Sequence, residues 1–149
     1  MSKLTISSQW WSAPAEADDG RTIIVTGRSG LQNVKDTSKF IYRVEVTWPY
    51  NQADAQGMPT EAESALMEQA QDLLEATFSA DPVAVNTGIY TGAGERNWVF
   101  YCRSLHIFQK KFNEALASMP QLPLTFTAEE DPDWEEYAEM LKAEVKAQD

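Results

Sequence analysis

The clearest pattern along the chain is an alternation of apolar and polar residues over residues 39–48, KFIYRVEVTW. This alternation is typical of a strand with one covered face and one wetter face. The side chains expected on the covered face are Phe40, Tyr42, Val44, Val46 and Trp48. Those expected on the wetter face are Arg43, Glu45 and Thr47.

The residues before this strand predict a strand pair and a loop. Residues 21–28 (RTIIVTGR) have a strand pattern, and a less regular one covers residues 4–11. Residues 17–20 (ADDG) predict the turn between these two strands. Residues 29–38 (SGLQNVKDTS) are polar and predict a loop.

Helical periodicity begins after a loop at residues 49–59. Thr60 and Glu63 have the spacing of a capping box, in which each side chain binds a free amide of the first turn. They predict a helix over residues 60–78. Its expected apolar face comprises Leu66, Ala70, Leu73, Leu74 and Thr77.

A predicted hairpin follows this helix. Its strands cover residues 83–91 and 95–103, and the turn between them is Gly92-Ala93-Gly94. Glycine fits this turn because it adopts the positive φ angles that a tight hairpin needs.

Two more helices flank a last predicted strand at residues 122–127. The first covers residues 105–119 and is capped by Ser104. The second starts with Asp131 as N-cap and Pro132 as the first helical residue. The expected apolar stripes are Leu105, Phe108, Phe112, Ala115, Leu116 and Met119 on the first, and Trp134, Tyr137, Ala138, Leu141 and Val145 on the second.

The order of the elements from residue 39 to 127 is strand, helix, strand, strand, helix, strand. This order is that of the ferredoxin-like split βαβ fold (βαββαβ), and right-handed crossovers place both helices on one face of its antiparallel sheet. We therefore predict an α+β protein with a single domain over residues 1–149. Its parts are an N-terminal strand pair and loop (1–38), a ferredoxin-like core (39–127) and an acidic C-terminal helix (128–149).

The charge of the chain is concentrated at its C-terminus. The 149 residues carry a formal charge of -11, and the acidic segment over residues 129–149, with nine acids and two bases, contributes -7. This balance disfavours nucleic acid and anionic lipid as main targets, because both need Lys and Arg clusters. We expect a basic protein partner for this segment, since acidic surfaces steer association with basic proteins. The candidate contact residues are Glu129, Glu130, Asp133, Glu135, Glu136 and Glu139.

The sequence offers no catalytic, cofactor-binding or metal-binding set, and an enzyme is the less favoured class. Cys102 is the single cysteine, which suits a reducing compartment, and a cytoplasmic location is expected. A Cys102–His106 pair would need an orienting group, and a structural thiol with a surface imidazole is the simpler interpretation. The acids near Asp131 fit helix capping better than acid–base catalysis.

Two alternatives stay open. One is an enzyme or small-ligand binder with a pocket on the sheet or at the loop over residues 48–59, and its candidate lining residues are Arg43, Trp48, Tyr50 and Arg96. The other, less favoured, is an RNA-binding module that stacks bases on Tyr90, Trp98 and Phe100. The oligomeric state is not indicated by any pattern.

Three segments resemble the bacterial family called domain of unknown function 695. They are a helix start with Gly57, Pro59 and Glu63, a strand with Trp98, Phe100 and Tyr101, and a C-terminal motif with Asp131, Pro132, Trp134 and Tyr137. The Asp-Pro-x-Trp-x-x-Tyr motif is also similar to the ending of the type B regulators of ribonuclease E activity, a more distant resemblance. Those regulators are small acidic ferredoxin-like proteins that bind and restrain an enzyme. By analogy, the resemblance implies a non-enzymatic, protein-binding or regulatory role.

Overall fold

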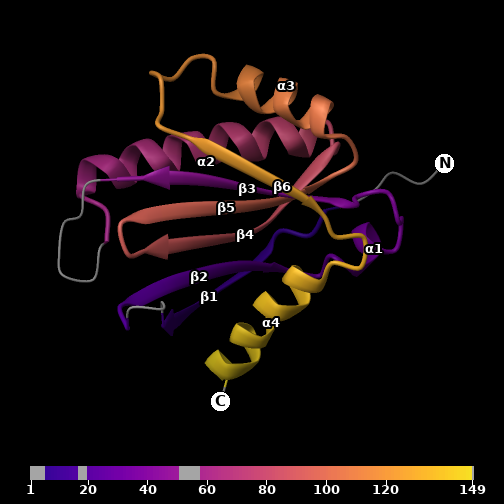
Figure 1. Cartoon of the computed structure of the whole chain (residues 1–149), viewed down its shortest axis with the longest axis horizontal. Coiled ribbons are helices and arrows are strands. Elements are labelled where there is room, and N and C mark those ends of the chain that lie inside the picture. Colours follow the sequence, from indigo (N-terminus) through magenta and orange to yellow (C-terminus); the bar gives the residue numbers. More distant parts are fainter. Residues whose placement is uncertain (1–5, 17–19, 51–57, 149) are drawn as a thin grey trace.

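The computed structural model describes residues 6–16, 20–50 and 58–148, and they form one six-stranded antiparallel sheet with helices on both faces (Figure 1). The strands are β1 (Gln9–Glu16), β2 (Thr22–Ser29), β3 (Tyr42–Pro49), β4 (Ala84–Gly92), β5 (Glu95–Cys102) and β6 (Thr125–Glu130). The helices are α1 (Gln32–Lys35), α2 (Glu61–Ala80), α3 (Leu105–Ala115) and α4 (Glu135–Gln148). The prediction of an α+β protein is confirmed.

The strand order across the sheet is β1-β2-β4-β5-β3-β6. The hairpins β1–β2 and β4–β5 pair directly, whereas β3 lies between β5 and β6. Chain connections through α2 and α3 therefore carry the backbone across the sheet. The sheet ends at β1 on one side and at β6 on the other.

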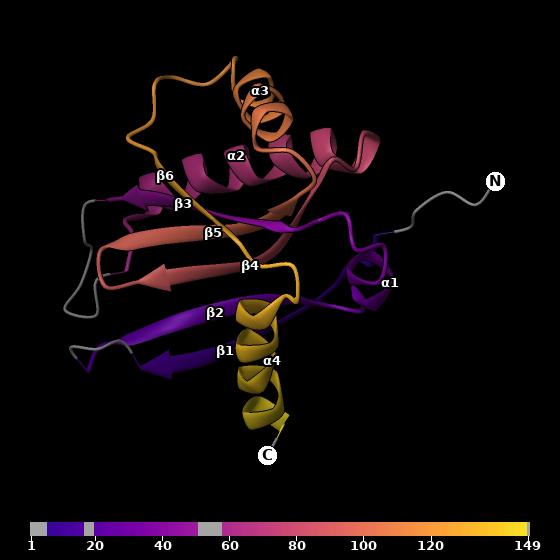
Figure 2. The same ribbon diagram turned by 45° about the vertical axis from the view of Figure 1, so that its right-hand side comes forward.

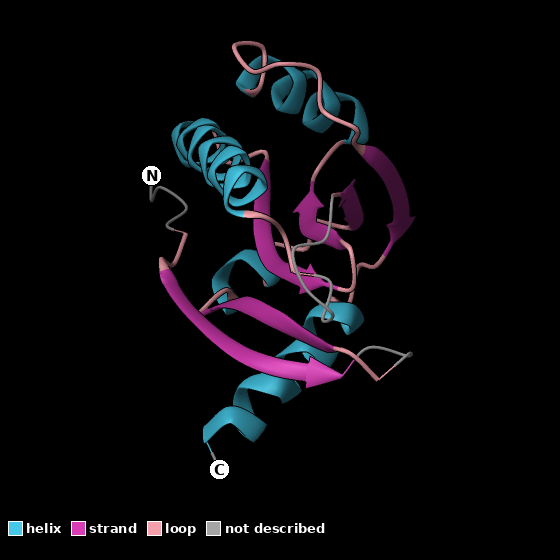
Figure 3. Cartoon of the chain, turned by 90° about the vertical axis from the view of Figure 1, so that its left-hand side faces the viewer, coloured by secondary structure: helices cyan, strands magenta, loops and turns pink. Residues whose placement is uncertain are grey.

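One face of the sheet packs against α2 and α3 (Figure 3). Val44, Val46 and Trp48 of β3 meet Trp98, Phe100 and Cys102 of β5 there, as the predicted alternation requires. The helices contribute Met67, Ala70, Leu74 and Phe78 from α2 and Phe108 and Phe112 from α3. The aromatic rings contact one another closely: Phe100 lies 5.1 Å from Phe108 between ring centroids.

The opposite face packs against α4, which crosses β1, β2 and β4 (Figure 2). Gly27 and Gly88 are paired across β2 and β4, and a Cβ on either would overlap a side chain above it. That side chain is Trp11 for Gly27 and Met140 for Gly88. Gly27 thus leaves room for the Trp11 side chain of the neighbouring strand β1, and Gly88 leaves room for α4 to approach the sheet. A second apolar core forms under α4.

Several sequence predictions are corrected by the structure in the first half of the chain. Phe40 lies before β3 and packs in the core under α4, not beside Val44 on the α2 face. The predicted loop at residues 29–38 contains the short helix α1, whose Val34 is fully buried. The strand expected over residues 4–11 lies later in the chain, as β1 over Gln9–Glu16. Residues 17–19 of the predicted turn lie outside the described residues.

The helix that follows Thr60 begins where it was predicted, because the Thr60 hydroxyl accepts a hydrogen bond from the Glu63 amide at 3.2 Å. Its predicted face omitted Met67 and Phe78, which are buried. The predicted stripe of α3 wrongly included Leu105, which is 39% exposed. Helix α3 also ends at Ala115, four residues earlier than predicted.

The C-terminal elements begin later than the sequence predicted. Strand β6 starts at Thr125, three residues after the predicted start. Helix α4 starts at Glu135, so Pro132 is not its first helical residue. Residues 131–134 form a turn instead, and Trp134 there has a φ of 56°. The predicted stripe of α4 also missed Met140, whereas Ala138 is exposed.

Candidate protein-binding surface

A hydrogen-bonded corner joins β6 to α4. Asp131 is 7% exposed, and its carboxylate accepts hydrogen bonds from the Glu135 amide (2.9 Å) and the Glu136 amide (3.1 Å). It also accepts one from the Tyr101 hydroxyl at 2.6 Å. Asp131 therefore caps α4 from four residues ahead of the helix, where its negative charge faces the free amides of the first turn.

The pKa of Asp131 follows from these contacts. Burial alone would raise this pKa, but the Tyr101 hydroxyl, the two amides and the charge of Arg43 together lower it. The pKa of Tyr101 is raised, first by burial and then by its bond to Asp131. The pair thus stays as an ionised carboxylate with a neutral phenol at neutral pH.

Trp134 and Tyr137 hold α4 against the sheet. The Trp134 ring stacks on the Tyr101 ring at 4.4 Å between centroids, and its indole Nε1 donates to the Phe40 carbonyl at 2.8 Å. The Tyr137 hydroxyl donates to the Arg28 carbonyl at 2.6 Å. The left-handed φ of Trp134 is strained for a residue with a large side chain, and these contacts fix it. Trp134 and Tyr137 therefore pack as predicted, and the motif anchors α4.

The corner presents six exposed acidic side chains, which we call the acidic surface. They are Glu129, Glu130, Asp133, Glu135, Glu136 and Glu139. These six residues are the partner-binding candidates of the sequence, and the structure brings them onto the end of β6 and the start of α4. Partner binding by these residues stays a prediction.

Few cations neutralise the acidic surface. Arg43 of β3 lies 3.4 Å from Glu129 and 3.0 Å from Glu45, and Lys142 lies 2.9 Å from Glu139. Burial lowers the pKa of Arg43, but the hydrogen bond that it donates to Glu45 and nearby negative charges raise the pKa overall. Within the described part of the chain, no ion pair involves the other four acids of the surface.

Three of the four pocket candidates, Trp48, Tyr50 and Arg96, lie near one another, and Arg43 lies apart from them. Trp48 is 1% exposed and packs edge-on against Trp98 under α2 and α3, whereas Arg43 points to the opposite face of the sheet. Arg96 pairs in register with Trp48 and donates to the Thr91 hydroxyl at 3.0 Å. Burial lowers the pKa of Arg96, and its nearness to Tyr50 opposes that shift.

Tyr50 borders a shallow surface hollow of about 340 Å³ together with Pro49, Glu63 and Pro123. Residues 51–57 of the loop proposed for a ligand, including Gly57 of the motif, lie outside the described residues. Arg43 thus lies on the face of the sheet opposite the other three candidates.

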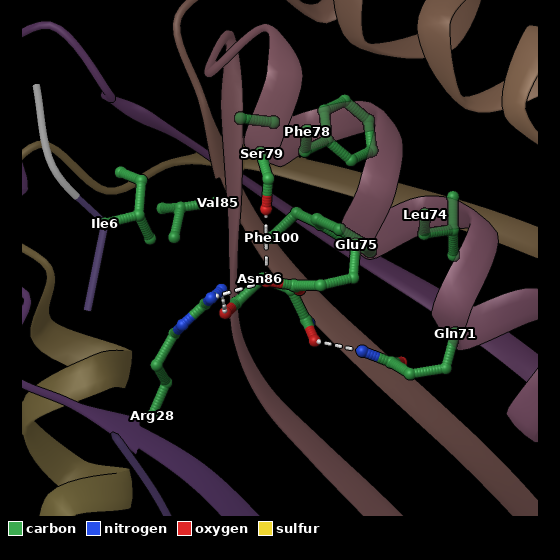
Figure 4. Close-up of a pocket in the computed structure, with 11 residues that line it drawn as sticks. Ile6, Arg28, Gln71, Leu74, Glu75, Phe78, Ser79, Val85, Asn86 and Phe100 are labelled. Carbon is green, nitrogen blue, oxygen red and sulfur yellow. Dashed lines mark hydrogen bonds and ion pairs between the residues drawn. The ribbon is translucent and has the colours of Figure 1, made fainter. Parts of the chain in front are cut away.

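A small cavity with polar and apolar lining residues lies between β2, β4 and α2 (Figure 4). The Arg28 guanidinium donates there to the Glu75 carboxylate at 2.6 Å and to the Asn86 carbonyl at 3.2 Å. Gln71 donates to the Asn86 side chain at 3.3 Å. The cavity measures about 10 Å³, which is room for one water molecule and not for a substrate. These contacts tie β2 to α2.

A groove with a mixed polar and apolar lining lies between α3 and β6, and we call it the α3–β6 groove. It has a volume of about 400 Å³, and the Phe126 side chain at its rim is 41% exposed. Its lining residues are Asn113, Leu116, Ala117, Met119, Pro120, Gln121, Leu122, Leu124 and Phe126. The sequence predictions did not include this groove, since they extended the helix to residue 119 and began the last strand at residue 122.

The single cysteine and the single histidine lie apart. Cys102 is fully buried in the core under α2 and α3, and burial raises its pKa to about 11. His106 is exposed on the first turn of α3. A buried thiol with a raised pKa is a poor nucleophile. Among the described residues, no group of three His, Cys, Asp or Glu side chains is placed to hold a metal ion.

The aromatic residues considered for RNA stacking are also placed by the structure. Trp98 and Phe100 are at most 1% exposed beneath α2 and α3. Tyr90 lies on the other face and is half-buried. A row of stacking rings open to solvent is therefore not formed by these three residues.

One of three comparisons with known proteins identifies a family for this chain. Residues 9–142 match the model of a family of unknown function, DUF695. The chain belongs to this family. The comparison with curated proteins and the comparison with solved structures each found no match. In this DUF695 chain, no described helix has both the length and the apolar composition to cross a bilayer.

The family assignment agrees with the motif residues that the sequence singled out, and the structure shows what several of them do. Asp131, Trp134 and Tyr137 fasten α4, and Tyr101 of the strand motif is their common partner. The functional meaning of Tyr101 was missed because its partners lie 30 or more residues away along the chain. Its position two residues after Val99, on the face opposite Phe100, was the available signal.

Proposed function

We propose that this DUF695 protein is a non-enzymatic protein-binding module that uses its acidic surface to bind a basic segment of another protein. The observation that carries the proposal is the exposure of six acidic side chains on a corner whose backbone is fastened by Asp131, Trp134 and Tyr137. A surface held in one conformation before binding loses less entropy when a partner docks.

Charge supports a basic partner. The acidic segment carries -7 of the -11 charges of the chain, and four of the six surface acids have no ion pair among the described residues. A field of one sign accelerates encounter with a partner of the opposite sign and makes binding sensitive to salt.

We further infer that β3 to β6, with α2 and α3, form a ferredoxin-like unit to which the β1–β2 hairpin and α4 are added. The strand order β4-β5-β3-β6 and the shared face of α2 and α3 support this inference. We also propose that the protein works in the bacterial cytoplasm as a regulator. Its lone cysteine and the similarity of its C-terminal motif to the type B regulators of ribonuclease E activity support that role.

The proposal is tested by capture of partners from lysate with two matched variants. The first is Glu130→Lys/Glu135→Lys/Glu136→Lys on the acidic surface. The second carries three reversals at exposed acids elsewhere, Glu68→Lys, Asp72→Lys and Glu114→Lys. Both change the net charge equally, and circular dichroism checks that both fold.

The expected result is a set of basic proteins that the wild type and the second variant retain and the first variant loses. Raising the salt concentration should release the same proteins. A partner set that is identical for the wild type and both variants would show that the acidic surface is not the binding site.

A further inference from the structure

The two edges of the sheet are different. Strand β1 contains Pro14, which lacks an amide hydrogen and blunts an edge against pairing. Strand β6 contains no proline, and all six of its residues are exposed. Its only strand partner within the described chain is β3. The β6 edge is therefore open to a further strand.

The direction of the free backbone groups follows from the register. The Asp131 amide donates to the Ile41 carbonyl at 2.7 Å, on the β3 side. In an antiparallel pair the inward and outward backbone groups alternate. The amides and carbonyls of Phe126, Ala128 and Glu130 therefore point away from β3, toward the open edge.

The two sides of this edge have different chemistry. Phe126 packs on Phe112 at 5.1 Å and borders the α3–β6 groove, so an apolar side chain of an added strand fits beside it. Glu129 lies on the opposite face with Arg43, whereas Glu130 pairs in register with Tyr42 and is exposed on the same face as Phe126. Phe126 and Glu130 are four residues apart, roughly 13 Å along a strand.

We propose that β6 accepts an extended peptide segment as a seventh strand, with an apolar residue beside Phe126 on one face and a basic residue beside Glu129 on the other. This inference rests on the proposed function and specifies how the basic partner binds. A second copy of this chain is the less favourable occupant, because its own β6 would bring two further carboxylates, Glu129 and Glu130, to the same acidic edge. Main-chain hydrogen bonds supply affinity in such strand addition, and the alternate side chains supply specificity.

The test uses the full chain and a synthetic eight-residue peptide that alternates leucine or valine with lysine, blocked at both ends and fluorescently labelled. Affinity is measured by fluorescence anisotropy. Two sets of peptides each carry one N-methyl group per peptide. In the first set the methyl group is on the amide of a leucine or valine, and in the second set it is on the amide of a lysine. Methylation removes a backbone donor and leaves the charge unchanged.

The matched protein variants are Ala128→Pro and Ala128→Thr. Proline removes the outward amide of residue 128 and leaves the β3 ladder bonds in place, whereas threonine keeps that amide. We expect Ala128→Pro to weaken peptide binding at least tenfold and Ala128→Thr to change it less than threefold. One N-methyl set should abolish binding and the other should be tolerated, because only alternate amides face the edge.

Amide hydrogen exchange gives a second reading that needs no substitution. Peptide binding should slow exchange at Ala128 and Glu130, while Thr127 and Glu129 are already protected by β3. One outcome would overturn strand addition but not the proposed function: the acidic-surface reversals weaken peptide binding, whereas Ala128→Pro and both N-methyl sets leave it unchanged. Peptide binding that is unaffected by those reversals would overturn the proposed function as well.

Discussion

The hydroxyl of Tyr101 is the single group whose removal most directly tests the fastening of α4. The substitution Tyr101→Phe deletes the hydrogen bond to the ionised and nearly buried Asp131 and the one that the hydroxyl shares with the Tyr137 backbone, and it leaves the stacking on Trp134 in place. A hydrogen bond to a charged group contributes about 1.5–3 kcal/mol to stability. Asp131 keeps its two amide donors, so we expect a loss within that range.

The loss should depend on pH in a defined direction. The native pKa of Asp131 lies below its ordinary value, so ionised Asp131 stabilises the fold fully above about pH 3.9. That contribution is lost as the pH falls through the lower native pKa. Below it a neutral hydrogen bond remains, so the cost of Tyr101→Phe should shrink to about 1 kcal/mol.

Urea unfolding followed by tryptophan fluorescence measures these differences at pH 7 and at pH 3. The control is Tyr42→Phe, whose half-buried hydroxyl has no hydrogen bond to another described residue, and it should change stability by less than about 0.5 kcal/mol. Equal m-values would show that the same surface is exposed on unfolding. If Tyr101→Phe costs no more than Tyr42→Phe at pH 7, or if its cost is larger at pH 3 than at pH 7, the role given to the Tyr101–Asp131 pair is wrong.

Two further properties follow from the packing. Gly27→Ala and Gly88→Ala should each destabilise the protein by about 1–3 kcal/mol in urea unfolding, because the new methyl overlaps Trp11 or Met140. A smaller cost of Gly88→Ala in a Met140→Ala background would confirm this cause. An unchanged cost in that background would contradict it. The thiol of Cys102 should react with an aromatic disulfide at pH 8 about two hundredfold more slowly in the native protein than in urea, because burial raises its pKa to about 11; comparable rates in the two states would show that the thiol is accessible.

The sequence predicted the core of the fold because local signals there agree with tertiary packing. The alternation in β3 and the Thr60 cap are short-range patterns, and both occur in the structure as expected. The start of α4 was misplaced for a physical reason. Asp131 and Pro132 look like a cap and a first turn, but Asp131 is turned toward Tyr101, and Trp134 adopts a left-handed conformation that no local pattern indicates.

The candidate surface was predicted better than the candidate pocket. The acidic residues cluster along the chain, and consecutive exposed residues near one turn stay near one another when the chain folds. Three of the proposed pocket residues lie within residues 43–50, and the parity of their positions decides which of them share a face. Arg43 and Trp48 are five residues apart on one strand, so they face opposite sides of the sheet. The open edge of β6 depends on strand order, which residue patterns alone do not give.

The central claim is that the corner between β6 and α4 is where a basic partner binds. The most direct measurement is a titration of the isotope-labelled protein with the lysine-containing peptide, followed by amide chemical shifts. The account predicts shifts concentrated at residues 125–139 that disappear at high salt and in the Glu130→Lys/Glu135→Lys/Glu136→Lys variant. Shifts that centre on the outer face of α2, or that persist in this variant, would contradict it.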